Sequence, residues 1–216
     1  MKTGILQSFE TIPYFTLEGF KQASGVDLPG HARVQVYRWA KAGHLLTLKR
    51  GVYMTRRFYE QHSRDYLFSP AVSAILLPLS YLSLEFVLQK HNLLTEATYP
   101  ITCITTKNTR RIVNPIGAFW YRHLRADLYC GFTITDYFGI RIAQASLAKA
   151  LFDYLYLRPL PASFRTSKLD LAEELRLNLD DLPSADREEF ARCVETGNSR
   201  KMTDILNNFR SHVWQT

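Results

Sequence analysis

Four side chains between residues 33 and 41 are of the types that proteins use to recognise DNA bases. They are Arg33, Gln35, Arg38 and Lys41. Arginine and glutamine can each make a paired contact with a base edge, whereas lysine offers a point charge to a base or to a phosphate. The hydroxyl of Tyr37 adds a further hydrogen-bonding group. The chemistry expected of this segment is recognition of double-stranded DNA.

A helix from about His31 to Ala42, closed by Gly43, must position these side chains. At about 100° per residue, the apolar residues that would pack share one face, namely Ala32, Val36, Trp39 and Ala40. The opposite face carries Val34, Tyr37, Arg38 and Lys41, with Arg33 and Gln35 on its flanks. Trp39 belongs to the packing face, so we interpret it as a core residue and not as a base-stacking residue.

The segment LLTLKRGVYM, residues 45–54, follows this helix and predicts two short strands around a turn. Its turn residues are Lys49, Arg50 and Gly51. If the hairpin only packed against the core, an Asn-Gly or Asp-Gly turn would suit it as well as a cationic one. We therefore expect Lys49 and Arg50 to reach a neighbouring phosphate or the minor groove, while Gly51 allows the tight reversal.

Two helices are predicted before this segment, over residues 4–12 and from Thr16 to Gly25. Thr16 is a good N-cap, and Gly25 is a good left-handed terminator. A turn over residues 26–31 then leads into the third helix. This order of helices followed by a hairpin is that of a winged helix-turn-helix, which we assign to residues 1–60 as a DNA-binding domain. The alternative is that the arginines and lysines only form a solvated helix face.

Residues 66–216 are predicted to form a second, mixed α/β domain with C-terminal helices, reached through a polar link over TRRFYEQHSRDYLF. The fold class is therefore α+β. Expected helices cover 69–79, a segment capped by Ser83, and 146–157; expected strands cover 99–106, 118–124, 131–138 and 140–143. Three short helices are expected after residue 168, separated by residues 180–183 and 197–198. The turn at 107–111 is either simply solvated or part of a second positive surface that faces DNA or an acidic protein.

Composition agrees with a globular protein that meets polyanions. The 216 residues carry a formal charge of +7, and residues 1–65 hold ten Lys and Arg against five Asp and Glu.

The N-terminus has no signal-peptide pattern and no apolar run is long enough to span a membrane, so we expect a cytoplasmic protein. Three distant cysteines are expected to be free thiols, and no metal or other cofactor is expected. Without a phosphate loop, GxSxG or HExxH motif, the chain is not expected to be an enzyme.

Three blocks of the chain resemble the AbiEi antitoxin family of type IV toxin–antitoxin and abortive-infection systems. They are RWAKAGHLLTLKRGVYM (38–54), YLSLEFVLQKHNLL (81–94) and IRIAQASLAKALFDYLYLR (140–158). The family's wing closes on Arg-Gly-Val-Tyr, which matches residues 50–53, and its last block matches Lys149, Ala150, Leu151 and Asp153. The chain departs from the family at Ala148, where an acidic residue is usual.

The resemblance implies a protein that binds the operator of its own operon and also neutralises a nucleotidyltransferase-like toxin. Two other hypotheses stay open on the residues alone. One is a stand-alone winged-helix regulator whose second domain binds a ligand or a protein partner. The other is an enzyme acting on nucleic acid, for which no catalytic constellation is recognisable.

Overall fold

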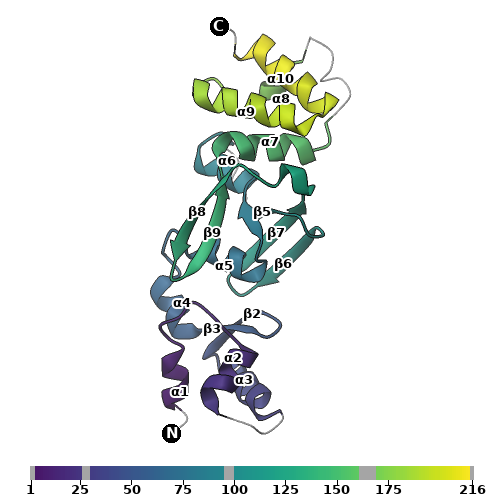
Figure 1. Ribbon diagram of the computed structural model, residues 1–216. Coiled ribbons are helices and arrows are strands. Elements are labelled where there is room, and N and C mark those ends of the chain that lie inside the picture. The colour runs from purple at the N-terminus through teal and green to yellow at the C-terminus, as the bar shows by residue number, and fades with distance from the viewer. Residues whose placement is uncertain (1–2, 26–29, 95–99, 161–168, 215–216) are drawn as a thin grey trace. The chain divides into compact units, whose positions relative to one another are not determined.

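The computed structural model describes residues 3–25, 30–94, 100–160 and 169–214 (Figure 1). The protein has the α+β fold class that the sequence predicts. The chain divides into two compact units. The first comprises Met1–Pro78 with two later segments, 112–118 and 136–141, and the second comprises the remainder. The predicted domain boundary at residues 60–66 thus falls inside the first unit.

The first unit contains the predicted helices and hairpin together with two further elements, the strand Phe15–Thr16 and the helix Arg56–His62. Its elements are α1 (Thr3–Ser8), β1 (Phe15–Thr16), α2 (Leu17–Ser24), α3 (His31–Lys41), β2 (Leu45–Lys49), β3 (Val52–Thr55), α4 (Arg56–His62) and α5 (Phe68–Leu76). The strands form an antiparallel sheet in the order β1-β3-β2. The turn predicted before α3 lies largely on residues 26–29, outside the described residues.

Both ends of α2 are as the sequence predicts. The Oγ1 atom of Thr16 accepts a hydrogen bond of 3.0 Å from the backbone N–H of Gly19, which satisfies one of the free donors of the first turn. Gly25 follows the last turn with φ of 59°, a conformation that glycine adopts without a steric penalty. The position and length of α2 are therefore determined by local sequence.

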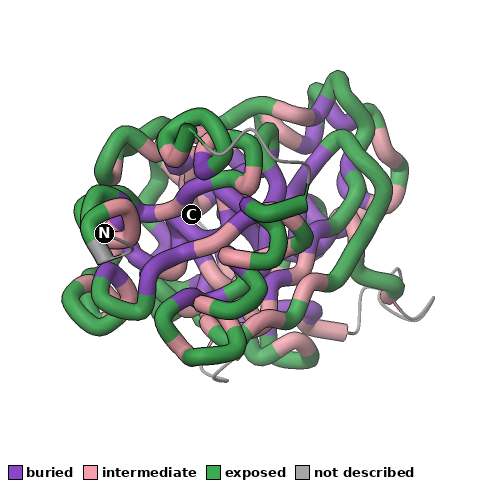
Figure 2. The backbone as a smooth tube through the Cα atoms, turned by 90° about the horizontal axis from the view of Figure 1, so that it is seen from below, coloured by how far each residue is buried: buried purple, intermediate pink, exposed green. Residues whose placement is uncertain are grey.

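Aromatic rings hold α2 and α3 in the core of the first unit. Phe20 of α2 is buried, and its ring meets the ring of Trp39 edge-on with centroids 5.4 Å apart. Ala32 and Val36 of α3 are buried in the same cluster, which also includes Phe9, Phe15 and Leu45. Buried and exposed stretches alternate along the backbone, as expected for elements that each present one face to the core (Figure 2). The predicted packing face of α3 is confirmed.

The segment predicted to link the two domains, residues 55–68, belongs to the first unit, and half of it is the helix α4 (Arg56–His62). Thr55 caps this helix by accepting a hydrogen bond of 3.1 Å from the N–H of Phe58, and the Phe58 side chain is fully buried. The ring of Phe138, from the segment 136–141, lies edge-on to the Phe58 ring at 5.3 Å. Tyr137 of the same segment donates a hydrogen bond of 2.7 Å to the Asp65 carboxylate. Contacts with residues that are distant in sequence therefore pack this polar segment into the first unit.

The second unit contains most of a six-stranded mixed sheet and the C-terminal helices. The elements from residue 80 onward are β4 (Ser80–Leu82), α6 (Glu85–Lys90), β5 (Ile101–Thr105), β6 (Arg110–Asn114), β7 (Gly117–His123), the 3-10 helix η1 (Ala126–Leu128), β8 (Phe132–Tyr137), β9 (Ile140–Ala145), α7 (Leu147–Leu157), α8 (Leu171–Glu174), α9 (Ser184–Gly197) and α10 (Arg200–His212). The strand order is β6-β7-β5-β4-β9-β8. Strand β4 pairs antiparallel with β5 and parallel with β9, and β5 pairs parallel with β7.

Most predicted elements of this region are present, with two corrections. Arg110 and Arg111 belong to β6 and not to the predicted turn. Ser83 does not cap α6, whose N-cap is Leu84, because the Ser83 hydroxyl donates instead to Asp153 at 2.8 Å. The three helices of the tail are confirmed, and Tyr99 of the predicted strand lies outside the described residues. Within the described parts of the chain, no helix combines the length and the apolar character needed to cross a membrane.

Candidate nucleic-acid interface

Helix α3 presents to solvent most of the residues that the sequence singles out for DNA. Five exposed residues, here called the solvent face of α3, are Arg33, Val34, Tyr37, Arg38 and Lys41. The exposed fractions are 47% for Val34 and 65% for Tyr37, whereas Ala32 and Val36 on the opposite side are almost completely buried. Gln35 is half-buried, in keeping with its position on a flank. The helix can therefore pack and leave its cationic face open.

The end of α3 is fixed by backbone hydrogen bonds that connect the helix to the hairpin. The N–H of Ala42 donates to the carbonyl of Arg38 at 2.9 Å, and the N–H of His44 donates to the carbonyl of Trp39 at 2.9 Å. Gly43 between them has φ of 80°, a left-handed conformation that stops the helix. Leu45 then begins β2, so the path from the solvent face of α3 to the hairpin is short and well defined.

The solvent face of α3 lies in a stretch of unbalanced charge. Residues 28–59 contain seven Lys and Arg and no Asp or Glu. Among the described residues, the side chains of Arg33, Tyr37, Arg38, Lys41 and Arg50 form no hydrogen bond or ion pair. Clustered cations without neighbouring carboxylates create a positive potential that attracts polyanions.

The hairpin presents Arg50 at its tip. Thr47 pairs with Tyr53 and Lys49 pairs with Val52, with an irregularity in the strand between Thr47 and Lys49. Gly51 adopts φ of 78°, which a residue with a Cβ would adopt only with strain. Its carbonyl accepts a hydrogen bond of 2.9 Å from the N–H of Leu17, so the tip is tied to the first residue of α2. Arg50 is exposed at the start of this fixed turn.

Lys49 departs from the sequence-based prediction of a phosphate contact. Its ammonium donates hydrogen bonds to the carbonyls of Ile75 at 3.0 Å and Leu76 at 2.8 Å, the last two residues of α5. The final carbonyls of a helix lack partners within the helix and lie at the negative end of its dipole, so a cation is stabilised there. Lys49 thus joins the hairpin to α5, and we interpret it as a residue that stabilises the fold. No local signal could reveal these partners, which lie 26 and 27 residues away in sequence.

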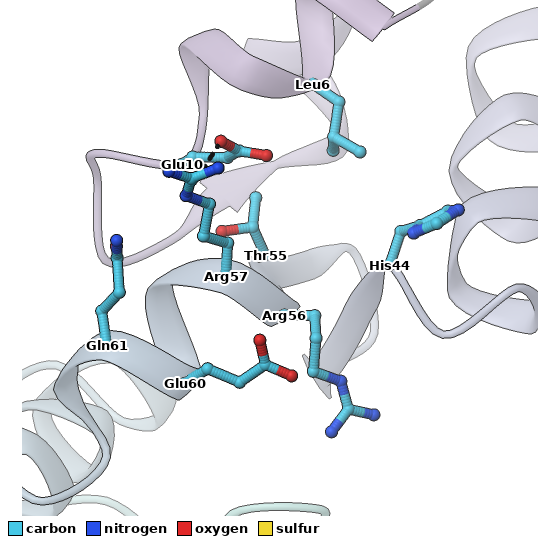
Figure 3. A pocket seen from close by; sticks show the side chains of 8 residues that line it. All are labelled: Leu6, Glu10, His44, Thr55, Arg56, Arg57, Glu60 and Gln61. Carbon is cyan, nitrogen blue, oxygen red and sulfur yellow. Dashed lines mark ion pairs between the residues drawn. The ribbon is translucent and has the colours of Figure 1, made fainter.

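An open pocket of about 450 Å³ lies elsewhere in the first unit, and Figure 3 shows the side chains that line it. Arg57 forms an ion pair with Glu10 at 3.5 Å, drawn as a dashed line in the figure. Arg56 donates from Nε to the carbonyl of Gly43 at 3.3 Å. The lining holds two arginines and two glutamates, since Glu60 is the fourth charged residue. Because these charges balance, the pocket is a weaker candidate for binding a polyanion than the solvent face of α3, whose cations have no carboxylate partner among the described residues.

The second unit contains a buried polar cluster built on Lys149 and Asp153, one helical turn apart on α7. Their exposed fractions are 1% and 0%. The ammonium of Lys149 forms an ion pair with the Asp153 carboxylate and donates a hydrogen bond of 3.0 Å to the Tyr81 hydroxyl. Tyr81 in turn donates to Asp153 at 2.8 Å, as does Ser83.

This cluster is suited to stabilising the fold and not to binding a substrate. Burial raises the pKa of the Asp153 carboxyl, while the Lys149 ammonium acts in the opposite direction. Every polar group of the cluster has a partner, and the exposed fractions leave no route for a substrate to reach them. Sequence reasoning found Lys149 and Asp153 through the resemblance alone, although their i, i+4 spacing already marks a helical ion pair.

The charged segment after β5 leaves both of its sequence-based interpretations open. Lys107, Arg110 and Arg111 are exposed. The Arg111 guanidinium lies 4.4 Å from the centre of the Trp120 ring on the neighbouring strand β7, a cation–π arrangement. Charged residues on an edge strand such as β6 also prevent unwanted pairing with other chains, so exposure here does not identify a partner.

Comparisons with known proteins do not identify this chain. No protein-family model matches it, and a comparison with curated proteins finds no match. The functional conclusion therefore depends on the geometry of α3 and the hairpin, together with the sequence resemblance.

Proposed function

We propose that this protein binds double-stranded DNA through the solvent face of α3 and Arg50, and that it represses transcription of its own operon. The observation that carries the proposal is the set of exposed cations on α3, which have no intramolecular partner among the described residues. An α-helix fits the major groove, where arginine and glutamine can distinguish bases.

The arrangement of elements supports the same proposal. Helix α2, helix α3 and the β2–β3 hairpin follow one another, and β1 completes a small antiparallel sheet. This is the order by which winged helix-turn-helix modules are recognised, with the second helix of the pair in the groove. In this arrangement Arg50 contacts a phosphate beside the groove, whereas Arg33, Gln35 and Arg38 are the candidates for base contacts.

We further propose that the protein is an antitoxin that neutralises a nucleotidyltransferase-like toxin. This part rests on the three blocks that resemble the AbiEi family, two of which supply the α6 region and the β9–α7 segment of the second unit. A stand-alone transcriptional regulator, whose second unit binds a ligand or a protein partner, is the competing function.

A gel-shift titration with the DNA upstream of the protein's own coding sequence tests the DNA-binding proposal. The wild-type protein should bind tightly at low salt, and its affinity should fall as salt rises, because phosphate contacts release counterions. Binding that is absent at low salt, or indifferent to salt, contradicts the proposal. Arg38→Ala should weaken binding by about 1–3 kcal/mol if Arg38 pairs with a base.

Co-expression with the adjacent open reading frame separates the antitoxin from the regulator. If that neighbour arrests growth and this protein restores it, the antitoxin function is supported. An Arg38→Ala variant provides a control, because rescue through direct neutralisation does not need operator binding when both genes have foreign promoters. Failure of the wild-type protein to restore growth under those promoters favours the regulator.

A further inference from the structure

Val34 is an exposed aliphatic residue on a helix face that is otherwise basic and polar. It is 47% exposed, and at about 100° per residue it lies near the centre of the solvent face of α3, between Arg38 and Tyr37. Lys41 lies two turns further along the same side. Tyr37, three residues on, is 65% exposed, so the two residues form a short apolar stripe framed by cations.

Folding alone does not explain this valine. The packing of α3 is supplied by Ala32 and Val36 on the opposite side, both buried. Valine is also a poorer helix former than alanine, because its branched side chain loses rotamer freedom against the preceding turn. Isolated exposed apolar residues are common, but this one is at the centre of the face that we propose enters the major groove.

Within the major groove, the base edge that suits an aliphatic side chain is the C5-methyl group of thymine. We propose that Val34 is a specificity-determining residue that contacts a thymine methyl, with Tyr37 covering one side of the contact. The surrounding cations favour this occupant over an apolar protein surface: Arg33, Arg38 and Lys41 would have to lose water against such a surface without a partner, whereas DNA supplies phosphates and base acceptors. The inference rests on the proposed DNA binding and adds a base preference to it.

Replacing single thymines by deoxyuridine tests the contact directly, because uracil keeps the base pair and lacks only the methyl group. Full-length protein would be titrated with the upstream duplex and with a series of duplexes that each carry one such replacement. Loss of one buried methyl should weaken wild-type binding about fourfold at the contacted position, and leave binding unchanged at most others.

The variant Val34→Ala completes a thermodynamic cycle. It should bind the thymine duplex more weakly than wild type, yet lose nothing further from deoxyuridine at the contacted position. The exposed site and the better helix propensity of alanine should leave its thermal stability unchanged or slightly raised. Thr47→Ala, at an exposed position on the neighbouring strand β2, is the matched control and should keep the full sensitivity to the methyl group.

The outcomes separate this inference from the function on which it rests. If the wild-type protein does not bind the upstream DNA at low salt, both the proposed DNA binding and the proposed role of Val34 are contradicted. Binding that ignores every thymine methyl, or sensitivity that Val34→Ala leaves unchanged, overturns the role of Val34 alone. A change from dimer to monomer in sedimentation of Val34→Ala, without any effect of deoxyuridine, assigns the stripe to a protein interface and also overturns the inference.

Discussion

At the scale of single residues, the Lys149–Asp153 pair shows how a buried charge is tolerated. The cost of removing two charges from water is offset only when the partners satisfy each other and their remaining hydrogen bonds. Tyr81 and Ser83 supply those hydrogen bonds from β4 and the residue that follows it. The cluster thus joins α7 to the central strand β4 with polar contacts that a purely apolar core would not specify.

Removing one member of the pair should be far more harmful than removing both. Lys149→Met leaves an unpaired buried carboxylate, so we expect the free energy of unfolding to fall by about 3–5 kcal/mol in urea titrations. The double variant Lys149→Met, Asp153→Leu should lose less stability than Lys149→Met alone, because it leaves no unpaired buried charge. Lys107→Met, at an exposed position, should change stability by less than about 0.5 kcal/mol and serves as control. A cost for Lys149→Met equal to that of the control would contradict the assignment.

The three free cysteines differ in the access that reagents have to them. Cys130 is exposed, Cys193 is partly buried and Cys103 is fully buried. Burial raises the pKa of the Cys193 thiol to about 11, which leaves very little reactive thiolate near pH 8. A thiol-specific chromogenic disulfide should therefore label one cysteine rapidly, and Cys130→Ser should remove this fast phase. Fast labelling that persists in Cys130→Ser would show that another thiol is accessible.

At the scale of elements, two lysines satisfy the carbonyl ends of helices that lie far from them in sequence. Lys49 serves α5, and Lys201 of α10 serves α7, where it donates to the carbonyls of Leu155 at 2.6 Å and Tyr156 at 3.1 Å. Partial burial lowers the pKa of the Lys201 ammonium. A cation at the negative end of a helix dipole stabilises the helix and joins it to its neighbour.

The neighbouring residues Lys49 and Arg50 should therefore separate stability from DNA binding. Lys49→Met removes hydrogen bonds from a charged donor, so we expect a loss of about 1.5–3 kcal/mol in the free energy of unfolding. Arg50→Ala should leave that free energy nearly unchanged, weaken DNA binding and lower the salt slope by about 1. Urea titration and salt-series gel shifts on both variants give the comparison. The reverse pattern, with Arg50 stabilising and Lys49 binding, would contradict these roles.

Elements with strong local signals were predictable from the sequence, and elements made by distant contacts were not. Thr16 and Gly25 mark α2 through their own chemistry, and the apolar spacing of α3 separates its two faces. By contrast, α4 depends on the burial of Phe58, and β1 has only two residues, too few to show alternation. The exposure of the cations on α3 could be predicted because it follows from helix geometry, whereas the hydrogen bonds of Lys49 could not, because its acceptors belong to α5.

At the scale of the whole molecule, the first unit is assembled from three separate parts of the chain. Residues 136–141 bring the Phe138 ring to 5.3 Å from Phe58 and 4.8 Å from His62, and Asn114 donates a hydrogen bond of 3.0 Å to the carbonyl of Leu48. An N-terminal piece that ends near residue 60 lacks all of these contacts. The unit that carries the solvent face of α3 is therefore supported by residues that follow this helix by about a hundred positions.

Phe138→Ala should weaken the first unit although Phe138 is 49% exposed. Each lost ring contact contributes about 0.5–1.5 kcal/mol, so we expect a loss of about 1–3 kcal/mol and faster hydrogen exchange of the α4 amides. Val113→Ala, at a residue that is 77% exposed in the other inserted segment, is the matched control and should have little effect. Unchanged exchange in α4 after Phe138→Ala would show that the ring contributes nothing to this helix.

The interleaved order of the chain also has a consequence during translation. N-terminal domains generally fold first as a protein is made, but here residues 112–118 and 136–141 must leave the ribosome before the first unit can gain all of its contacts. A nascent chain that has emerged only as far as α5 therefore still lacks part of the support for its cationic helix. The operator binding that we propose should therefore reach full capacity late in synthesis, once the strands that carry both inserted segments have been made.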